Sequence, residues 1–129
     1  MTYLEVLCII AAYIELQCMK RISKELTAAS SIPIILSILN QGETYGYEII
    51  RKVALLSEGE VEWTDGMLYP VLHKLENKGF IKAEWRIAPE TKRKRKYYSI
   101  TNKGQKQLQS EQVQWQTMNM VFGKLWELK

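Results

Sequence analysis

The segment of this sequence with the clearest binding chemistry is a run of five consecutive cations, Lys92 to Lys96. Nine Lys or Arg residues lie between Lys82 and Lys106, against only Glu84 and Glu90. Because the net charge of the whole chain is +4, most of its excess positive charge lies in this one segment. Clustered cations bind the phosphates of nucleic acids, whereas a basic loop without other support is more often a plain solvated surface.

A second group of polar side chains accompanies a helical pattern that ends near Asn77. Its apolar residues recur at helical spacing and form a stripe for the core: Leu68, Val71, Leu72 and Leu75. Thr64 or Asp65 caps the helix and Gly66 follows, so short side chains at its start allow bases and phosphates to approach closely. The polar residues on or beside its exposed side are Tyr69, His73 and Lys74. The helix alone is equally compatible with an ordinary surface helix.

The sequence contains few residues that could support catalysis. The chain has no Gly-rich phosphate loop and no paired carboxylates in a cleft pattern, and its single histidine, His73, lies inside the helix just described. Cys8 and Cys18 have too few companions for a zinc site and are too far apart along one helix for a disulfide. We expect two buried thiols in a reducing cytoplasm, no catalytic residue, no metal site and no cofactor.

Two further helices are expected upstream. The first covers Ile22 to Leu39, kinked or divided at Pro33, and Gly42 ends it in the left-handed conformation. Its core stripe is Ile32, Ile35, Leu36 and Leu39. The second covers 45–56, with Thr44 as its N-cap. Its apolar stripe is Tyr47, Ile50, Val53 and Ala54.

Past Gly79, which stops the third helix, the periodicity changes from helical to alternating and predicts a β-hairpin. One strand holds Phe80, Ile81, Ala83, Trp85 and Ile87, a second runs over 97–100, and the turn region 88–96 contains Pro89. Strand alternation would send Lys92, Lys94 and Lys96 to one side and Arg93 with Arg95 to the other, so we expect only some of them to reach a partner. Three helices followed by such a hairpin is the order of a winged helix-turn-helix, a mainly α fold with a small β-hairpin.

Thr101 caps a last helix, 102–128, which is too long to pack entirely against a domain of this size. Apolar residues recur along it at coiled-coil spacing and are the expected dimer interface: Leu108, Trp115, Met118, Phe122 and Leu125. The chain is therefore divided into an N-terminal apolar helix or extension (1–20), a winged-helix domain (21–100) and a dimerisation helix (101–129).

Residues 1–18 are apolar, but Glu5 and Glu15 interrupt them. They lack the basic start of a signal peptide and are short for a membrane span, so we expect neither, and no membrane partner. Two interpretations stay open: a helix that joins the dimer interface, or a segment upstream of a biological start at Met19.

Several motifs in order resemble the PadR family of transcriptional regulators. They are Gly46-Tyr47-Glu48, then Gly66-Met67-Leu68-Tyr69-Pro70-Val71-Leu72-His73-Lys74-Leu75-Glu76, then Lys94-Arg95-Lys96-Tyr97-Tyr98, and Ile100-Thr101-Asn102-Lys103-Gly104. The resemblance covers about residues 26 to 128, and its single last helix is similar to the short subgroup. Three positions depart from the family pattern: Met67 stands where Thr is usual, Thr64 where Ser is common, and Lys74 where Arg is frequent. These departures bear on DNA affinity and target sequence because a hydroxyl and a bidentate fork are lost.

The resemblance implies a cytoplasmic homodimer that binds a pseudo-palindromic operator in double-stranded DNA, as a repressor. The residues expected at DNA are Tyr45, Thr64, Asp65, Gly66, Met67, Tyr69, His73, Lys74, Lys92, Arg93, Lys94 and Arg95. Some short members of the family bind flat aromatic drugs against a Trp of the last helix. Trp115, with Met118, lies at the matching position and would hold a small hydrophobic or aromatic effector, although a plain packing role for Trp115 is the simpler interpretation. The alternative function is a winged-helix protein-interaction module that does not bind DNA.

Overall fold

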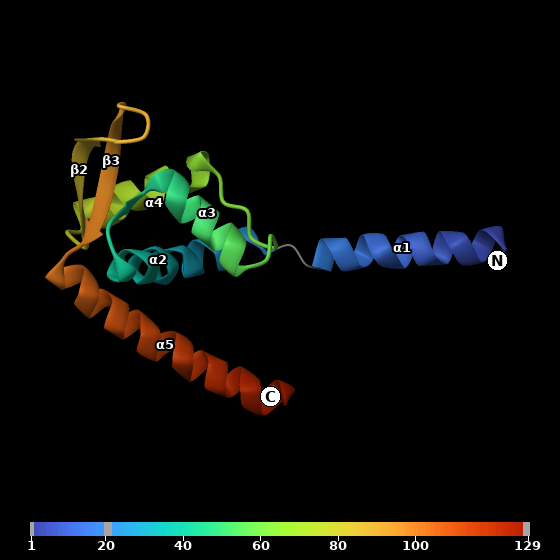
Figure 1. Cartoon of the computed structure of the whole chain (residues 1–129). Helices are drawn as coiled ribbons and strands as arrows, with labels where there is room; N and C mark the ends of the chain where they lie inside the picture. The colour runs from blue at the N-terminus through green and yellow to red at the C-terminus, as the bar shows by residue number, and fades with distance from the viewer. Residues whose placement is uncertain (1, 20–21, 128–129) are drawn as a thin grey trace.

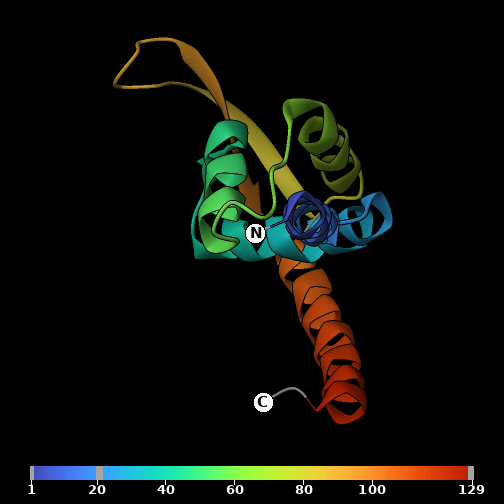
Figure 2. The same ribbon diagram turned by 90° about the vertical axis from the view of Figure 1, so that its right-hand side faces the viewer.

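The computed structural model describes residues 2–19 and 22–127, apart from the side chains of residues 13–19. Figure 1 shows the elements in chain order: α1 (Tyr3–Met19), α2 (Lys24–Gln41), β1 (Thr44–Tyr45), α3 (Gly46–Leu56), α4 (Asp65–Asn77), β2 (Ile81–Ile87), β3 (Lys94–Ile100) and α5 (Asn102–Trp126). The expected fold class, a mainly helical protein with a small sheet, is confirmed. The hairpin β2–β3 and the helix α5 project from opposite sides of the helical body (Figures 1 and 2).

The first of the expected helices, α2, is continuous through Pro33 rather than divided there. Proline removes one backbone hydrogen bond from a helix, but a long buried face compensates for that loss. Its buried residues are Ser31, Ile35, Leu36, Ile38 and Leu39. The helix begins at Lys24, because the hydroxyl of Ser23 accepts a hydrogen bond from the backbone N–H of Leu26 at 3.1 Å.

The junction between α2 and α3 differs from the expectation in three respects. Gly42 ends α2 at a positive φ that favours glycine (φ 157°, ψ 158°), but its ψ differs from that of the left-handed helical conformation. Thr44 is not an N-cap, because Thr44 and Tyr45 form the short strand β1, and Tyr45 takes the cap position of α3 without a side-chain hydrogen bond. Tyr47 is 66% exposed instead of buried, since Ile49 and Val53 supply the buried side chains of α3.

The sheet has three antiparallel strands in the order β1-β3-β2, so the hairpin gains an edge strand that the sequence pattern did not reveal. Thr44 pairs with Tyr98, and Ile81 pairs with Ile100. The second hairpin strand starts three residues earlier than expected, at Lys94, which lies opposite Ile87. The turn is therefore shorter, and the Ala88 backbone N–H closes it on the Arg93 carbonyl at 2.8 Å.

One face of the sheet covers the core only in the half of the hairpin that is farther from its turn. Ile81 and Tyr98 are buried there, together with apolar residues of the helices. Beyond them the hairpin leaves the helical body, so Trp85 and Ile87 are 64% and 66% exposed. The apolar residues of β2 share one face of the sheet, as the alternating pattern predicts, but in the half of β2 nearer the turn that face does not cover the core.

Two caps confirm expected helix starts. The Thr64 hydroxyl accepts from the Met67 backbone N–H at 3.2 Å, and the Thr101 hydroxyl accepts from the Gly104 N–H at 3.0 Å. Thr101 also donates to the Gly79 carbonyl at 2.6 Å, which fixes the start of α5 against the end of α4. This junction sets the direction in which α5 leaves the domain.

The expected interface residues of α5 divide into two groups. Leu108 is 3% exposed and packs in the core of its own chain, so the assignment of Leu108 to the dimer seam is corrected. It lies in the second turn of the helix, which still covers the domain. Trp115 and Phe122 are half-buried, and Met118 and Leu125 are exposed. Beyond its first turns, α5 therefore carries apolar side chains that its own domain leaves partly uncovered.

The N-terminal helix α1 extends away from the rest of the chain in Figure 1, and the residues at 2–12 are exposed. Cys8 is exposed and not a buried thiol as expected, because no described part of the chain covers its stretch of α1. The side chain of Cys18 lies outside the described residues. No helix in the described ranges 2–19 and 22–127 is long and apolar enough to cross a membrane.

Candidate nucleic-acid interface

The outer face of α4 carries most of the polar residues expected at DNA. Thr64, Asp65 and Gly66 are exposed at the start of the helix, and Tyr69, His73 and Lys74 are exposed along it. Met67 is half-buried and packs against the core, so it offers little surface to a partner. The buried face consists of Leu68, Leu72 and Leu75, as the sequence pattern predicts. The helix is thus anchored on one side and free on the other.

Tyr69 is held in place by a close approach to α3. A Cβ added at Gly46 would lie 2.7 Å from the Tyr69 hydroxyl oxygen and 3.1 Å from Cζ, so any larger residue at position 46 would displace the ring. Gly46 is the first residue of α3 and is buried. The glycine therefore allows the tyrosine to lie across the junction of the two helices, with its ring partly exposed.

Between α4 and the hairpin lies a groove of about 490 Å³, which we call the wing groove. It is lined by Tyr45, Gly46, Tyr47, Tyr69, His73, Trp85, Lys94, Arg95, Lys96 and Tyr98. The groove thus collects phenol, imidazole and indole rings together with three cations. Burial raises the pKa of Tyr98, at its base, to about 12, so this phenol is a neutral hydrogen-bonding group at physiological pH.

The five cations of the hairpin do not form one uniform surface. Lys92, Arg93 and Lys94 are exposed, and no ion pair of theirs is found among the described residues. Arg95 is half-buried: its guanidinium lies 3.9 Å from the centroid of the Tyr45 ring and donates to the Glu90 carboxylate. Lys96 faces the opposite side, with its Nζ 3.8 Å from Glu76. Three cations are therefore free for a polyanion, and two have partners within the chain.

The pair at the hairpin tip also perturbs its carboxyl group. Hydrogen bonds from its own backbone N–H and from Arg95 hold the pKa of Glu90 below its usual range. The same pair raises the pKa of Arg95. Both groups are charged at physiological pH, so the positive charge of Arg95 is compensated in the free protein.

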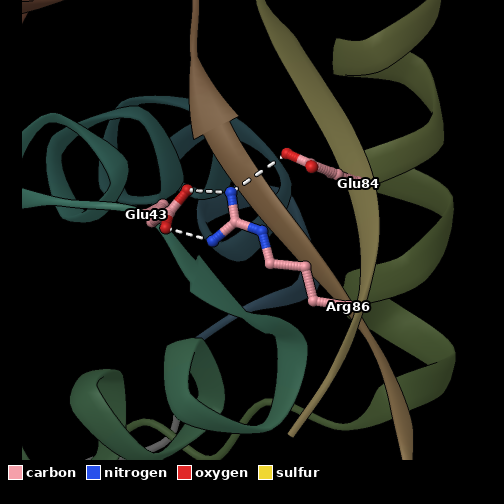
Figure 3. A network of polar contacts seen from close by, with 3 residues as sticks. All are labelled: Glu43, Glu84 and Arg86. Carbon is pink, nitrogen blue, oxygen red and sulfur yellow. Dashed lines mark hydrogen bonds and ion pairs between the residues drawn. The ribbon is translucent and has the colours of Figure 1, made fainter.

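A second network links the hairpin to the residue before β1 (Figure 3). Arg86, on β2, reaches across the sheet to both carboxylate oxygens of Glu43, one of them at 2.8 Å, and also contacts Glu84 at 3.0 Å. A bidentate arginine–carboxylate pair fixes direction as well as distance. Hydrogen bonds from Arg86 lower the pKa of Glu43. Because Glu43 directly precedes β1, the network ties the hairpin to the start of α3.

Tyr45 was placed at DNA by the resemblance, but its ring has a different environment. It packs edge-on against Tyr97, with centroids 5.7 Å apart, and Arg95 covers its face. Tyr45 thus borders the wing groove and orients Arg95. Sequence reasoning missed Tyr47, Trp85 and Tyr98 as groove residues. For Trp85 a signal exists, since a large aromatic residue lies next to the turn on a strand too long for the core to cover.

A separate pair of cavities lies between α2 and α5. Trp115 lines both, one of about 470 Å³ and the other of about 420 Å³, and Met118 lines the second. The Trp115 indole N–H donates to the Glu111 carboxylate at 3.3 Å. The two residues expected at an effector are thus together beside an apolar hollow. Across the described ranges, no group of three His, Cys, Asp or Glu residues could hold a metal ion.

Three helices, a three-stranded sheet with a projecting hairpin and an exposed polar helix beside it define a winged-helix protein. A family model described as the transcriptional regulator PadR-like family matches residues 35–110. The chain belongs to the PadR-like family of transcriptional regulators, which confirms the resemblance found in its motifs. Regulators of this family bind DNA.

Solved structures agree with this assignment. A transcriptional regulator from Clostridium thermocellum is 31% identical with a TM-score of 0.70, and the match covers 78% of this chain and 97% of that one. A PadR-like transcriptional regulator from Bacillus cereus is 27% identical with a TM-score of 0.71, over 82% of this chain and all of that one. A Lysinibacillus sphaericus protein called Uncharacterized protein X is 29% identical over 89 residues, 69% of this chain and 81% of its own length.

Proposed function

We propose that this protein is a sequence-specific repressor that binds a pseudo-palindromic DNA operator as a homodimer and is not an enzyme. The observation that carries the proposal is a groove with Tyr69 and His73 of the exposed face of α4 on one side and the free cation Lys94 of the hairpin on the other. A helix of this kind reads base edges in the major groove, while the neighbouring cations bind phosphates. Since its target is the chromosome, we place the protein in the cytoplasm.

Each group has a distinct role in this proposal. The short residues Thr64, Asp65 and Gly66 let the start of α4 approach the bases, and His73 with Lys74 offers donors along the same face. Tyr69, held by Gly46, donates its hydroxyl to a phosphate. Lys92, Arg93 and Lys94 bind phosphates from the wing, and Arg95 contributes mainly by orienting it.

The homodimer is proposed from the apolar face of α5. Trp115, Met118, Phe122 and Leu125 remain in the proposed interface, and Leu108 is removed from it because it is buried in its own chain. Partly uncovered apolar residues on a projecting helix favour association with a second copy. Two copies would present two α4 helices to half-sites about one helical turn apart.

The proposed effector site is the hollow beside Trp115. A small aromatic or hydrophobic molecule there would contact α2 and α5, the two helices on which the proposed dimer depends. A molecule that binds best to a dimer whose α4 spacing does not fit DNA must oppose DNA binding, and DNA opposes its binding by the same factor. DNA that stays fully bound when such an effector saturates the protein would contradict this part.

The operator is tested by selection from a pool of random duplexes, followed by sequencing of the bound fraction. The proposal predicts a two-fold symmetric motif whose half-sites are about 10 base pairs apart. The variant His73→Ala should select a motif changed within each half-site at the same spacing, because the residue lies on the reading helix. A pool that stays random after selection would refute sequence-specific binding. Binding that is indifferent to salt would favour the protein-interaction module.

A further inference from the structure

Trp85 occupies a position in the wing groove that the fold does not explain. It lies in the middle of β2, and 64% of its surface is exposed, although an indole ring is among the largest apolar groups a protein carries. The core ends below it, where Ile81 and Tyr98 are buried. Aromatic side chains are enriched at binding interfaces, so an exposed indole next to a binding surface is a candidate contact of that surface.

The surroundings of Trp85 define the chemistry of its partner. Trp85 pairs across the sheet with Lys96, and Ile87 pairs with Lys94, so both lysines share the face of Trp85. The Lys96 Nζ lies 6.0 Å from the centroid of the indole ring. Tyr69 and His73 form the opposite wall of the groove. The groove therefore presents cations and hydrogen-bond donors at its sides and an apolar ring between them.

We infer that the wing groove seats one sugar–phosphate strand of the DNA, with Trp85 packed on a deoxyribose beside phosphates bound by Lys94 and by Lys96, whose pair with Glu76 a phosphate replaces. This inference rests on the proposed function. The partner follows from charge complementarity, since a nucleic-acid strand alternates anionic phosphates with less polar sugars. The two cations and the apolar ring beside them match that alternation. Trp85 then contributes a contact that carries no charge.

The contrast between charged and uncharged contacts gives the test. Removing a phosphate contact lowers the slope of log K against log salt by about one, because one fewer counterion is released. Removing a packing contact lowers log K by the same amount at every salt concentration. We expect Trp85→Ala to weaken binding to random duplex about fivefold throughout, in parallel with wild type, and Lys94→Ala to flatten the slope.

Fluorescence anisotropy of a labelled duplex, at several concentrations between about 50 and 200 mM salt, measures both quantities. Trp85→Phe keeps an aromatic ring and should retain most of the affinity. Trp85→Thr keeps the strand preference of position 85 and should repeat the parallel loss if the alanine variant does not fold. Circular dichroism and sedimentation verify the fold and the oligomeric state of each variant.

The outcomes separate this inference from the proposed function. If wild type shows no salt-dependent binding, the proposed function fails. If wild type binds DNA and the Trp85 variants bind as tightly, only the inferred contact between Trp85 and the DNA strand is refuted. A flattened slope for Trp85→Ala would mean that the ring acts merely by placing cations, and a changed oligomeric state would place Trp85 between two copies of the chain. Either result would overturn the inference.

Discussion

The close packing of α5 on the hairpin allows a quantitative prediction for the stability of a variant at Gly104. A Cβ added there would lie 2.0 Å from the Phe80 carbonyl oxygen and 2.8 Å from Cγ1 of Ile100. That carbonyl cannot turn away freely, since it accepts a hydrogen bond from the Thr101 N–H at 3.0 Å. Gly104→Ala must therefore push the start of α5 off the sheet or break this bond.

The size of the effect follows from two opposing terms. Alanine in a helix is favoured over glycine by about 1 kcal/mol. Overpacking a tight contact costs roughly 1 to 3 kcal/mol or more, and losing the backbone bond adds about 1 kcal/mol. The clash involves backbone and not a flexible side chain, so the upper part of the range applies. We expect a net loss of about 3 kcal/mol in the free energy of unfolding and a Tm lower by roughly 12 °C.

Gly123 supplies a matched control in the same helix, because an added Cβ there meets nothing within 4 Å. Gly123→Ala should leave Tm unchanged or raise it, through helix preference alone. Thermal unfolding followed by circular dichroism, at one fixed protein concentration, compares the two variants. A Gly104→Ala protein as stable as Gly123→Ala would refute the packing described for the α5 junction.

Four further variants test the hairpin and α5. Glu43 has a lowered pKa in the folded chain, so its pair with Arg86 stabilises the fold above the ordinary carboxyl pKa. This stabilisation is lost as the pH falls through the lower pKa of the folded state. Glu43→Gln should therefore flatten the decline of Tm between about pH 5 and 3. Arg93→Ala should weaken binding to all DNA sequences alike and lower the slope of log K against log salt by about one. Glu90→Gln frees Arg95 and should raise both the affinity and this slope. Anisotropy titrations measure both quantities. Trp115→Ala should reduce binding of an aromatic dye while sedimentation still gives a dimer; a monomeric or unfolded product would support simple packing.

The order of the elements was predictable because each follows from a local pattern. The stripe of α4, with Leu68 and Leu72, and the caps Thr64 and Thr101 appear in the structure where the sequence places them. The strand β1 was not predictable, since two residues carry no periodicity and are held only by pairing with Tyr97 and Tyr98. Non-local pairing decides such elements.

The candidate site was predictable in composition but not in the roles of its members. A run of cations does not reveal which of them meet carboxylates: Arg95 has Glu90 five residues away, while Arg86 finds Glu43 across the sheet. Likewise, Leu108 matched the spacing of a dimer seam, and only the packing of α5 onto the domain shows that it is buried. Spacing identifies the face of a helix, and tertiary packing decides what covers that face.

The central claim, that α4 and the wing bind DNA, is tested most directly by the affinity of the wild-type protein for a random duplex at about 50 and 200 mM salt. Contacts to several phosphates predict tight binding at the lower concentration and a loss of orders of magnitude at the higher one. No binding at the lower concentration, or binding equal at both, would contradict the account.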